Sequence, residues 1–175
     1  QRVFGLVGIS PARHAELDME QIKARAQDVA ADAFTGRAAV TFKVEVRRPN
    51  KQFPLQSPEI AREVGAAILR GSGEGVSVDV HNPQVTIHVE VRGEGAFIYA
   101  KDYPGPGGLP VGTGGRGTLL LSGGIDSPVA GWLAMKRGVA ISGVYFHSFP
   151  FTTDRAKEKV LDLARVLARY SGGMK

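Results

Sequence analysis

Hydrophobic and polar positions divide the first hundred residues into two helices and several strands. An apolar stripe from Ile22 to Ala33 predicts a helix that Asp18 caps and that ends before Gly36. A second stripe predicts a helix opening at Ser57-Pro58. Alternating apolar and polar residues predict half-buried strands at 40–47, 76–80, 85–91 and 96–103. We therefore expect an α+β domain with both helices on one face of a mixed sheet.

After residue 117 the pattern changes to short buried strands that alternate with helices. A strand of three leucines leads through glycines to a helix that Ser127 caps, with Pro128 in its first turn. A strand over 140–146 and a helix capped by Asp154 follow. This order predicts the start of an α/β domain with a parallel sheet. Two cations are expected on the outer face of the last helix, Lys157 and Lys159.

The segment 104–117 carries seven glycines and three prolines, which is typical of an interdomain linker. We therefore expect one domain over 1–103 and the first part of a second over 118–175. Residues 3–9 fit either a strand or the tail of a preceding domain. Because the chain starts at Gln1 without methionine and stops just after a helix, we expect it to be part of a longer protein.

Composition narrows the possible chemistry. The net charge of +5 favours a polyanionic partner. The chain has no cysteine, which excludes disulfides, zinc–thiolate sites and a thiol nucleophile within it and agrees with a cytoplasmic location. No apolar run has the length of a membrane span, and the N-terminus is not a signal peptide.

The stretch from Leu119 to Pro128 carries the clearest chemical signal. A buried strand, a glycine turn and a helix start make converging N–H groups available to an anion, most naturally a phosphate chain. No Lys-Ser/Thr pair follows the glycines, so this is not the usual P-loop. Asp126 beside phosphates suggests a magnesium contact. The alternatives are an ordinary α/β turn and an acid that only favours the helix dipole.

Arg47, Arg48 and Lys51 form a basic turn next to a strand with one wet face, so they are the candidates for contacts with the phosphates of a polyanionic partner. A solvated basic loop is the alternative. The histidines His14, His81 and His88 have no metal-ligand spacing.

Ser122 to Ser127 resembles the S-G-G-x-D-S loop of the ATP pyrophosphatases. The whole chain resembles the tRNA 4-thiouridine synthetases (tRNA sulfurtransferases). The specific match is in residues 120–130, 135–139, 146–148, 151–152 and 155–160, and the first half looks like the family's RNA-binding THUMP domain through residues 44–48 and 87–92.

The resemblance implies a function and a set of site residues. THUMP would hold the tRNA, and a uridine would be adenylated by ATP before a persulfide, supplied by a cysteine desulfurase, displaces AMP to give 4-thiouridine. Thiamine biosynthesis is a further role of the family, and a homodimer is one possible assembly. Ser122, Gly123, Gly124, Asp126 and Ser127 would cradle the phosphates, and Leu120, Leu121, Tyr145 and Phe146 would border the adenosine.

Without cysteine, this chain is not expected to transfer sulfur by itself, and an exposed sheet edge is expected near its end. Two other functions stay open: an RNA-binding module without catalysis, and another pyrophosphatase-loop ATP-dependent ligase. The basic α+β half argues against the second.

Overall fold

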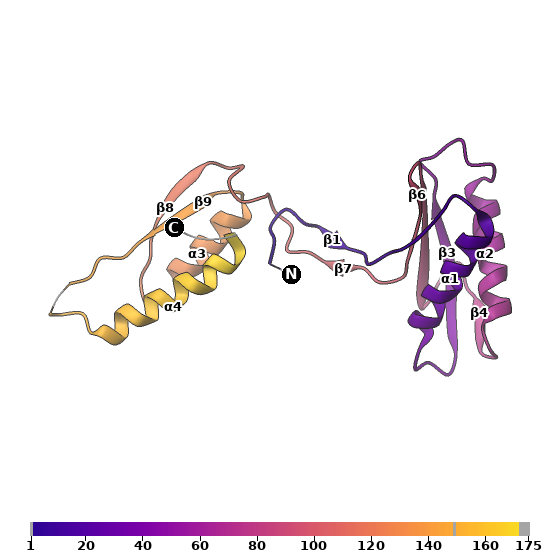
Figure 1. The fold of residues 1–175 in the computed structure, drawn as a ribbon. Helices are drawn as coiled ribbons and strands as arrows, with labels where there is room; N and C mark the ends of the chain where they lie inside the picture. The colour runs from indigo at the N-terminus through magenta and orange to yellow at the C-terminus, as the bar shows by residue number, and fades with distance from the viewer. Residues whose placement is uncertain (1, 149, 172–175) are drawn as a thin grey trace. The chain divides into compact units, whose positions relative to one another are not determined.

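The computed structural model describes residues 2–148 and 150–171 and divides the chain into two compact units (Figure 1). The α+β unit comprises Ser10–Asp102, and the glycine-loop unit comprises residues 2–9 and 103–171. Residues 2–9 belong to the glycine-loop unit and not to the α+β unit, because β1 (Gly8–Ile9) pairs antiparallel with β7 (Tyr103–Pro104). Within the described residues, no helix is both long and apolar enough to cross a membrane.

The α+β unit is built on a mixed sheet of five strands, which confirms the predicted class. The strand order is β2-β6-β5-β3-β4; β3 is parallel to both β4 and β5, whereas β6 is antiparallel to β5 and β2. The bounds are β2 (Arg13–Ala15), β3 (Val40–Arg47), β4 (Val76–Val78), β5 (Val85–Arg92) and β6 (Gly95–Tyr99). Strand β2 was not predicted from the sequence, because three residues are too few to show an alternating pattern.

Two helices, α1 (Met19–Phe34) and α2 (Ser57–Gly71), pack on one face of this sheet (Figure 1). The Asp18 carboxylate accepts a hydrogen bond from the Gln21 N–H at 3.0 Å, which confirms the predicted cap. The apolar residues of the alternating strands point into this core, where Phe42, Ile87 and Ile98 are fully buried. The polar residues of the same strands therefore lie on the uncovered face.

The glycine-loop unit begins its α/β part with β8 (Arg116–Leu120), α3 (Asp126–Lys136), β9 (Ala140–Val144) and α4 (Asp154–Ser171). Strands β8 and β9 are parallel, as expected. Helix α3 starts at Asp126 and not after Ser127, whose hydroxyl is used within the preceding loop and provides no cap. Its end agrees with the prediction, since Gly138 follows with φ of 88°.

Residues expected to form a linker pack against the glycine-loop unit instead of running free. Backbone N–H groups of Gly107, Leu109 and Gly112 donate to carbonyls of Leu6, Lys136 and Gly138 at 2.9, 2.9 and 2.7 Å. A glycine-rich stretch can make such close approaches because no side chains separate its backbone from its neighbours.

The N-terminal segment is anchored in the same unit by an aromatic cluster. Phe4 is 3% exposed, and its ring lies 5.3 Å from that of Trp132 on α3 and 5.5 Å from that of Tyr170 on α4. Residues at the start of the chain therefore support the helix that follows the glycine loop.

Candidate functional site

A loop held together by two serines connects β8 to α3. Ser127 Oγ accepts a hydrogen bond from the Ser122 N–H at 2.9 Å, and the two hydroxyl oxygens lie 3.0 Å apart. The Gly124 N–H points to Ser122 Oγ at 3.4 Å. Leu121 N–H donates to Val144 O at 2.8 Å, so the loop leaves from the carboxyl edge of both parallel strands. Ligands in open α/β sheets bind outside this edge.

The glycines of this loop are not required by its backbone. Neither Gly123 nor Gly124 has a positive φ. A Cβ on Gly123 would meet only Lys159 Cδ at 3.8 Å and Val160 Cγ2 at 4.0 Å, which are ordinary contacts. The turn itself could therefore be made by other residues at these two positions. What glycine does provide is a bare backbone that an anion can approach closely.

Asp126 is the first residue of α3, and its side chain is exposed. Its position favours the helix dipole whether or not a cation is bound. Within the described part of the chain, no three His, Asp or Glu side chains are grouped as a metal site. Asp126 fits a magnesium ion that takes its other ligands from phosphate and water, which is the common arrangement for this metal.

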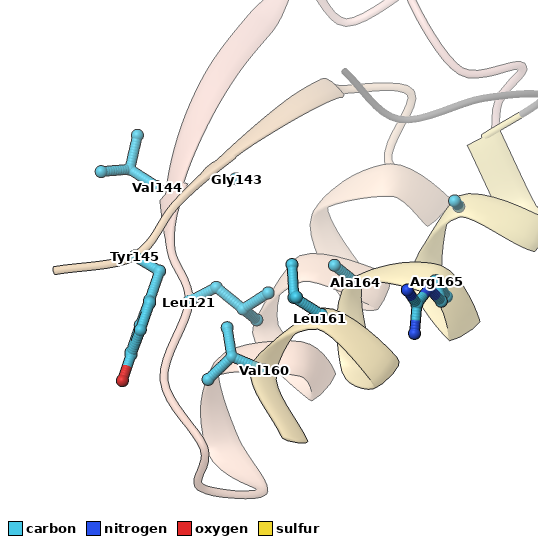
Figure 2. A pocket seen from close by; sticks show the side chains of 9 residues that line it. Leu121, Gly143, Val144, Tyr145, Val160, Leu161, Ala164 and Arg165 are labelled. Carbon is cyan, nitrogen blue, oxygen red and sulfur yellow. The ribbon is translucent and has the colours of Figure 1, made fainter. Parts of the chain in front are cut away.

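The four residues expected to border an adenosine divide into two pairs. Leu121 and Tyr145 line an apolar groove of about 320 Å³ between the strand ends and α4. Figure 2 shows Leu121 facing Val160 and Leu161 of α4 across this groove. Leu120 and Phe146 are 63% and 75% exposed and do not line the groove.

On the α+β unit, the uncovered sheet face carries a second hollow. Arg47, Glu90 and Arg92 line it, together with Pro49, Asn50, Gly93 and Glu94, and its volume is about 580 Å³. Arg92 bonds Glu90 Oε2 at 2.7 Å, and the Tyr99 hydroxyl donates to Glu90 Oε1 at 3.1 Å. The hydrogen bond from Arg92 lowers the pKa of Glu90. Partial burial opposes this by raising the pKa, and the hydrogen bond from the Tyr99 hydroxyl lowers it further. The hollow thus brings together two guanidinium groups, those of Arg47 and Arg92, and two carboxylates, those of Glu90 and Glu94.

The three residues of the predicted basic turn differ in their surroundings. Arg48 is half-buried, and its guanidinium donates to the carbonyls of Lys51 and Phe53 at 3.1 and 2.9 Å. Arg47 and Lys51 are exposed. Arg48 therefore holds the turn in shape, while Arg47 and Lys51 present their charges to solvent.

Two family models match the chain. The THUMP domain model matches residues 16–101, and the Thiamine biosynthesis protein (ThiI) model matches residues 112–175. A protein of Moorella thermoacetica named probable tRNA sulfurtransferase is 57% identical over 100% of this chain and 44% of its own length. The chain belongs to the tRNA sulfurtransferase family. It spans less than half the length of these curated relatives.

Solved structures agree with this family. A 4-thiouridine synthetase–RNA complex with bound ATP superposes with a TM-score of 0.91 at 45% identity, over 98% of this chain and 44% of that one. PH1313 from Pyrococcus horikoshii Ot3 gives 0.87 at 40% identity, over 99% and 57%. The basic turn lies within the THUMP match and the glycine loop within the ThiI match.

Two cationic residues lie near the candidate sites in positions that the sequence did not reveal. Arg92 is placed next to Arg47 by the pairing of β3 with β5, which sequence spacing does not reveal. Lys159 is exposed, as expected, and its side chain also lies next to Gly123. The apolar stripe that contains Val160 could have indicated this position of Lys159. Since Val160 is buried, the residue next to it on the helix lies at the edge of the buried face, near the loop.

Proposed function

We propose that this chain supplies the tRNA-binding and ATP-binding parts of an ATP-dependent tRNA thiolation enzyme, which makes 4-thiouridine. The glycine loop binds the phosphates of ATP through Ser122, Gly123, Gly124 and Ser127. The observation that carries this proposal is that the loop keeps two glycines that its own backbone geometry does not require. A bare backbone next to a helix N-terminus suits a phosphate chain.

Asp126 would hold magnesium on the phosphates, where the ion neutralises charge that builds up as pyrophosphate leaves. Leu120, Leu121, Tyr145 and Phe146 would border the adenosine. The groove lined by Leu121 and Tyr145 offers the apolar contact that a purine ring needs. A relative with the same fold was crystallised with RNA and ATP, which supports both ligands for this chain.

The α+β unit, which the THUMP model matches, would bind the tRNA through its basic turn. Arg47 and Lys51 contact phosphates, Arg48 keeps the turn in position, and Arg92 extends the cationic surface. Uridine adenylation and sulfur transfer from a cysteine desulfurase belong to the whole enzyme. The 175 residues contain no cysteine to carry the sulfur.

Binding measurements on two ligands test the proposal. Filter binding of bulk tRNA and equilibrium dialysis of Mg·ATP are compared for the wild type and Asp126→Asn. We expect both ligands to bind, and Asp126→Asn to weaken Mg·ATP while tRNA binding is retained. Binding of tRNA without ATP would instead favour an RNA-binding module without catalysis. Binding of ATP without tRNA would favour another pyrophosphatase-loop ligase.

A further inference from the structure

The glycine loop carries no cation of its own, since no Lys or Arg occurs from Leu121 to Leu133. A phosphate chain has several negative charges, and proteins commonly oppose them with Lys or Arg in addition to backbone N–H groups. In the usual P-loop a lysine directly after the glycines has this role. A loop without it leaves this role, beside that of magnesium, open to a cation from elsewhere in the fold.

One lysine from a distant helix lies beside this loop. Lys159 is in the second turn of α4, and its Cδ lies 3.8 Å from where a Cβ on Gly123 would be. The next residue, Val160, is 3% exposed and packs in the same core cluster as Leu121. Burial of Val160 therefore sets the rotation of α4 and holds the stem of Lys159 along the glycine. The ammonium lies beyond Cδ, where it can reach over the bare backbone.

The ammonium has no competing carboxylate in the described part of the chain, because Lys159 takes part in none of its ion pairs. Two lysines of the α+β unit are engaged in this way: Lys23 pairs with Glu20 at 2.6 Å, and Lys43 lies 3.6 Å from Glu45. An exposed and unengaged ammonium next to an anion-binding loop is available to a ligand.

We infer that Lys159 supplies the cation that contacts the phosphates of the nucleotide bound at the glycine loop. The inference rests on the proposed function and adds a binding residue to it. Lys159 lies beside Gly123, in the middle of the loop, whereas Tyr145 borders the groove proposed for the adenosine. The lysine thus recognises the phosphate chain and contributes nothing to recognition of the base.

Lys157 provides a matched control. It is exposed on the same helix and carries the same charge. Two positions along an α-helix turn the side chain by about 200°, so Lys157 points away from the face that carries Lys159. Replacing either lysine with methionine removes one charge and keeps most of the aliphatic stem.

The experiment measures the affinity of the whole chain for ATP, inorganic pyrophosphate and adenosine in the wild type, Lys159→Met, Lys159→Arg and Lys157→Met. We expect Lys159→Met to weaken ATP and pyrophosphate by about tenfold and to leave adenosine unchanged. Lys157→Met should match the wild type, and Lys159→Arg should recover part of the loss. Melting temperatures show whether each variant is folded.

The outcomes separate the two proposals. A wild type that binds no ATP overturns the proposed function, and the role of Lys159 with it. If the wild type binds ATP and Lys159→Met binds it as tightly as the wild type or as Lys157→Met does, only the role of Lys159 is overturned. Equal losses for ATP and adenosine would indicate a packing effect and would also overturn it. If Lys159→Met does not fold, Lys159→Gln takes its place. Weaker binding of ATP and pyrophosphate with unchanged adenosine binding then supports the charge contact, and wild-type affinity for pyrophosphate contradicts it.

Discussion

Ser127 Oγ accepts a hydrogen bond from the backbone N–H of Ser122 at 2.9 Å, so the hydroxyl that was expected to cap α3 instead closes the glycine loop on itself. The bond joins the first residue of the loop to the first turn of the helix. It gives the loop a defined shape in the absence of any side chain on Gly123 or Gly124.

This bond predicts different outcomes for two substitutions of Ser127. Ser127→Ala removes the acceptor, and one lost hydrogen bond is worth about 0.5–1.5 kcal/mol, so the affinity for ATP should fall by up to about tenfold. Ser127→Thr keeps the hydroxyl and should bind closer to the wild type. Equilibrium dialysis of ATP measures both. Wild-type affinity of the alanine variant would show that the bond has no role in binding.

The basic turn predicts that its residues act on RNA in different ways. Arg47→Ala and Lys51→Ala should each lower the affinity for tRNA and reduce the slope of log K against log salt by about 1, because each removes one phosphate contact. Arg48→Ala should mainly lower stability, by about 1 kcal/mol, because it frees the carbonyls of Lys51 and Phe53. Filter binding over a salt series and thermal unfolding separate the two effects.

Arg70 on α2 is exposed and serves as the control for a change in net charge. Arg70→Ala should leave the salt slope unchanged. If Arg70→Ala reduces it as much as Arg47→Ala does, tRNA binding does not depend on the basic turn.

The lowered pKa of Glu90 predicts how the stability of the α+β unit depends on pH. The hydrogen bond from Arg92 keeps the pKa of Glu90 below its ordinary value in the folded state. A carboxylate with a lowered pKa stabilises the fold above the unfolded pKa of about 4.3, and this contribution is lost as the pH falls through the folded pKa. Glu90→Gln should therefore cost about 1–2 kcal/mol at pH 7.

The cost of Glu90→Gln should disappear on acidification, since the wild-type carboxyl is then protonated as well. Urea unfolding of both proteins between pH 7 and pH 2.5 measures the difference. A difference that stays constant through this range would mean that ionised Glu90 does not stabilise the α+β unit.

From the buried position of Phe4 we expect the start of the chain to stabilise the glycine-loop unit. Phe4→Ala removes a buried ring from between Trp132 and Tyr170 and should cost about 3–5 kcal/mol. Amide hydrogen exchange should become faster in α3 and α4. Val7→Ala is the control, because Val7 is 83% exposed and its loss should change little. Unchanged exchange in α3 of the Phe4 variant would contradict this.

The helices and most strands could be predicted because their signals are local. Asp18 caps α1 through a contact three residues away, and the alternation in β3 and β5 is visible in the residues themselves. What could not be predicted depends on pairing across the chain. Strand β1 pairs with β7, and Phe4 packs against Trp132. In both cases the partners are far apart in the sequence, and no local pattern indicates that they meet.

The candidate sites show the same division. The glycine loop was found because its residue types are consecutive, whereas the side chain next to it, Lys159, comes from a helix whose rotation depends on the burial of Val160. Ser127 was predicted to cap α3, which is wrong. From the sequence alone, its hydroxyl is equally able to cap the helix and to accept a hydrogen bond from within the loop. Only the bond to Ser122 decides between them.

The most direct test of the central claim is the affinity of Gly123→Ala for ATP. A Cβ at this position meets only ordinary contacts and needs no positive φ, so the melting temperature should stay close to that of the wild type. If the loop holds phosphates against its bare backbone, the added methyl group should weaken ATP binding by about tenfold or more. A folded Gly123→Ala variant that binds ATP as tightly as the wild type would contradict the account.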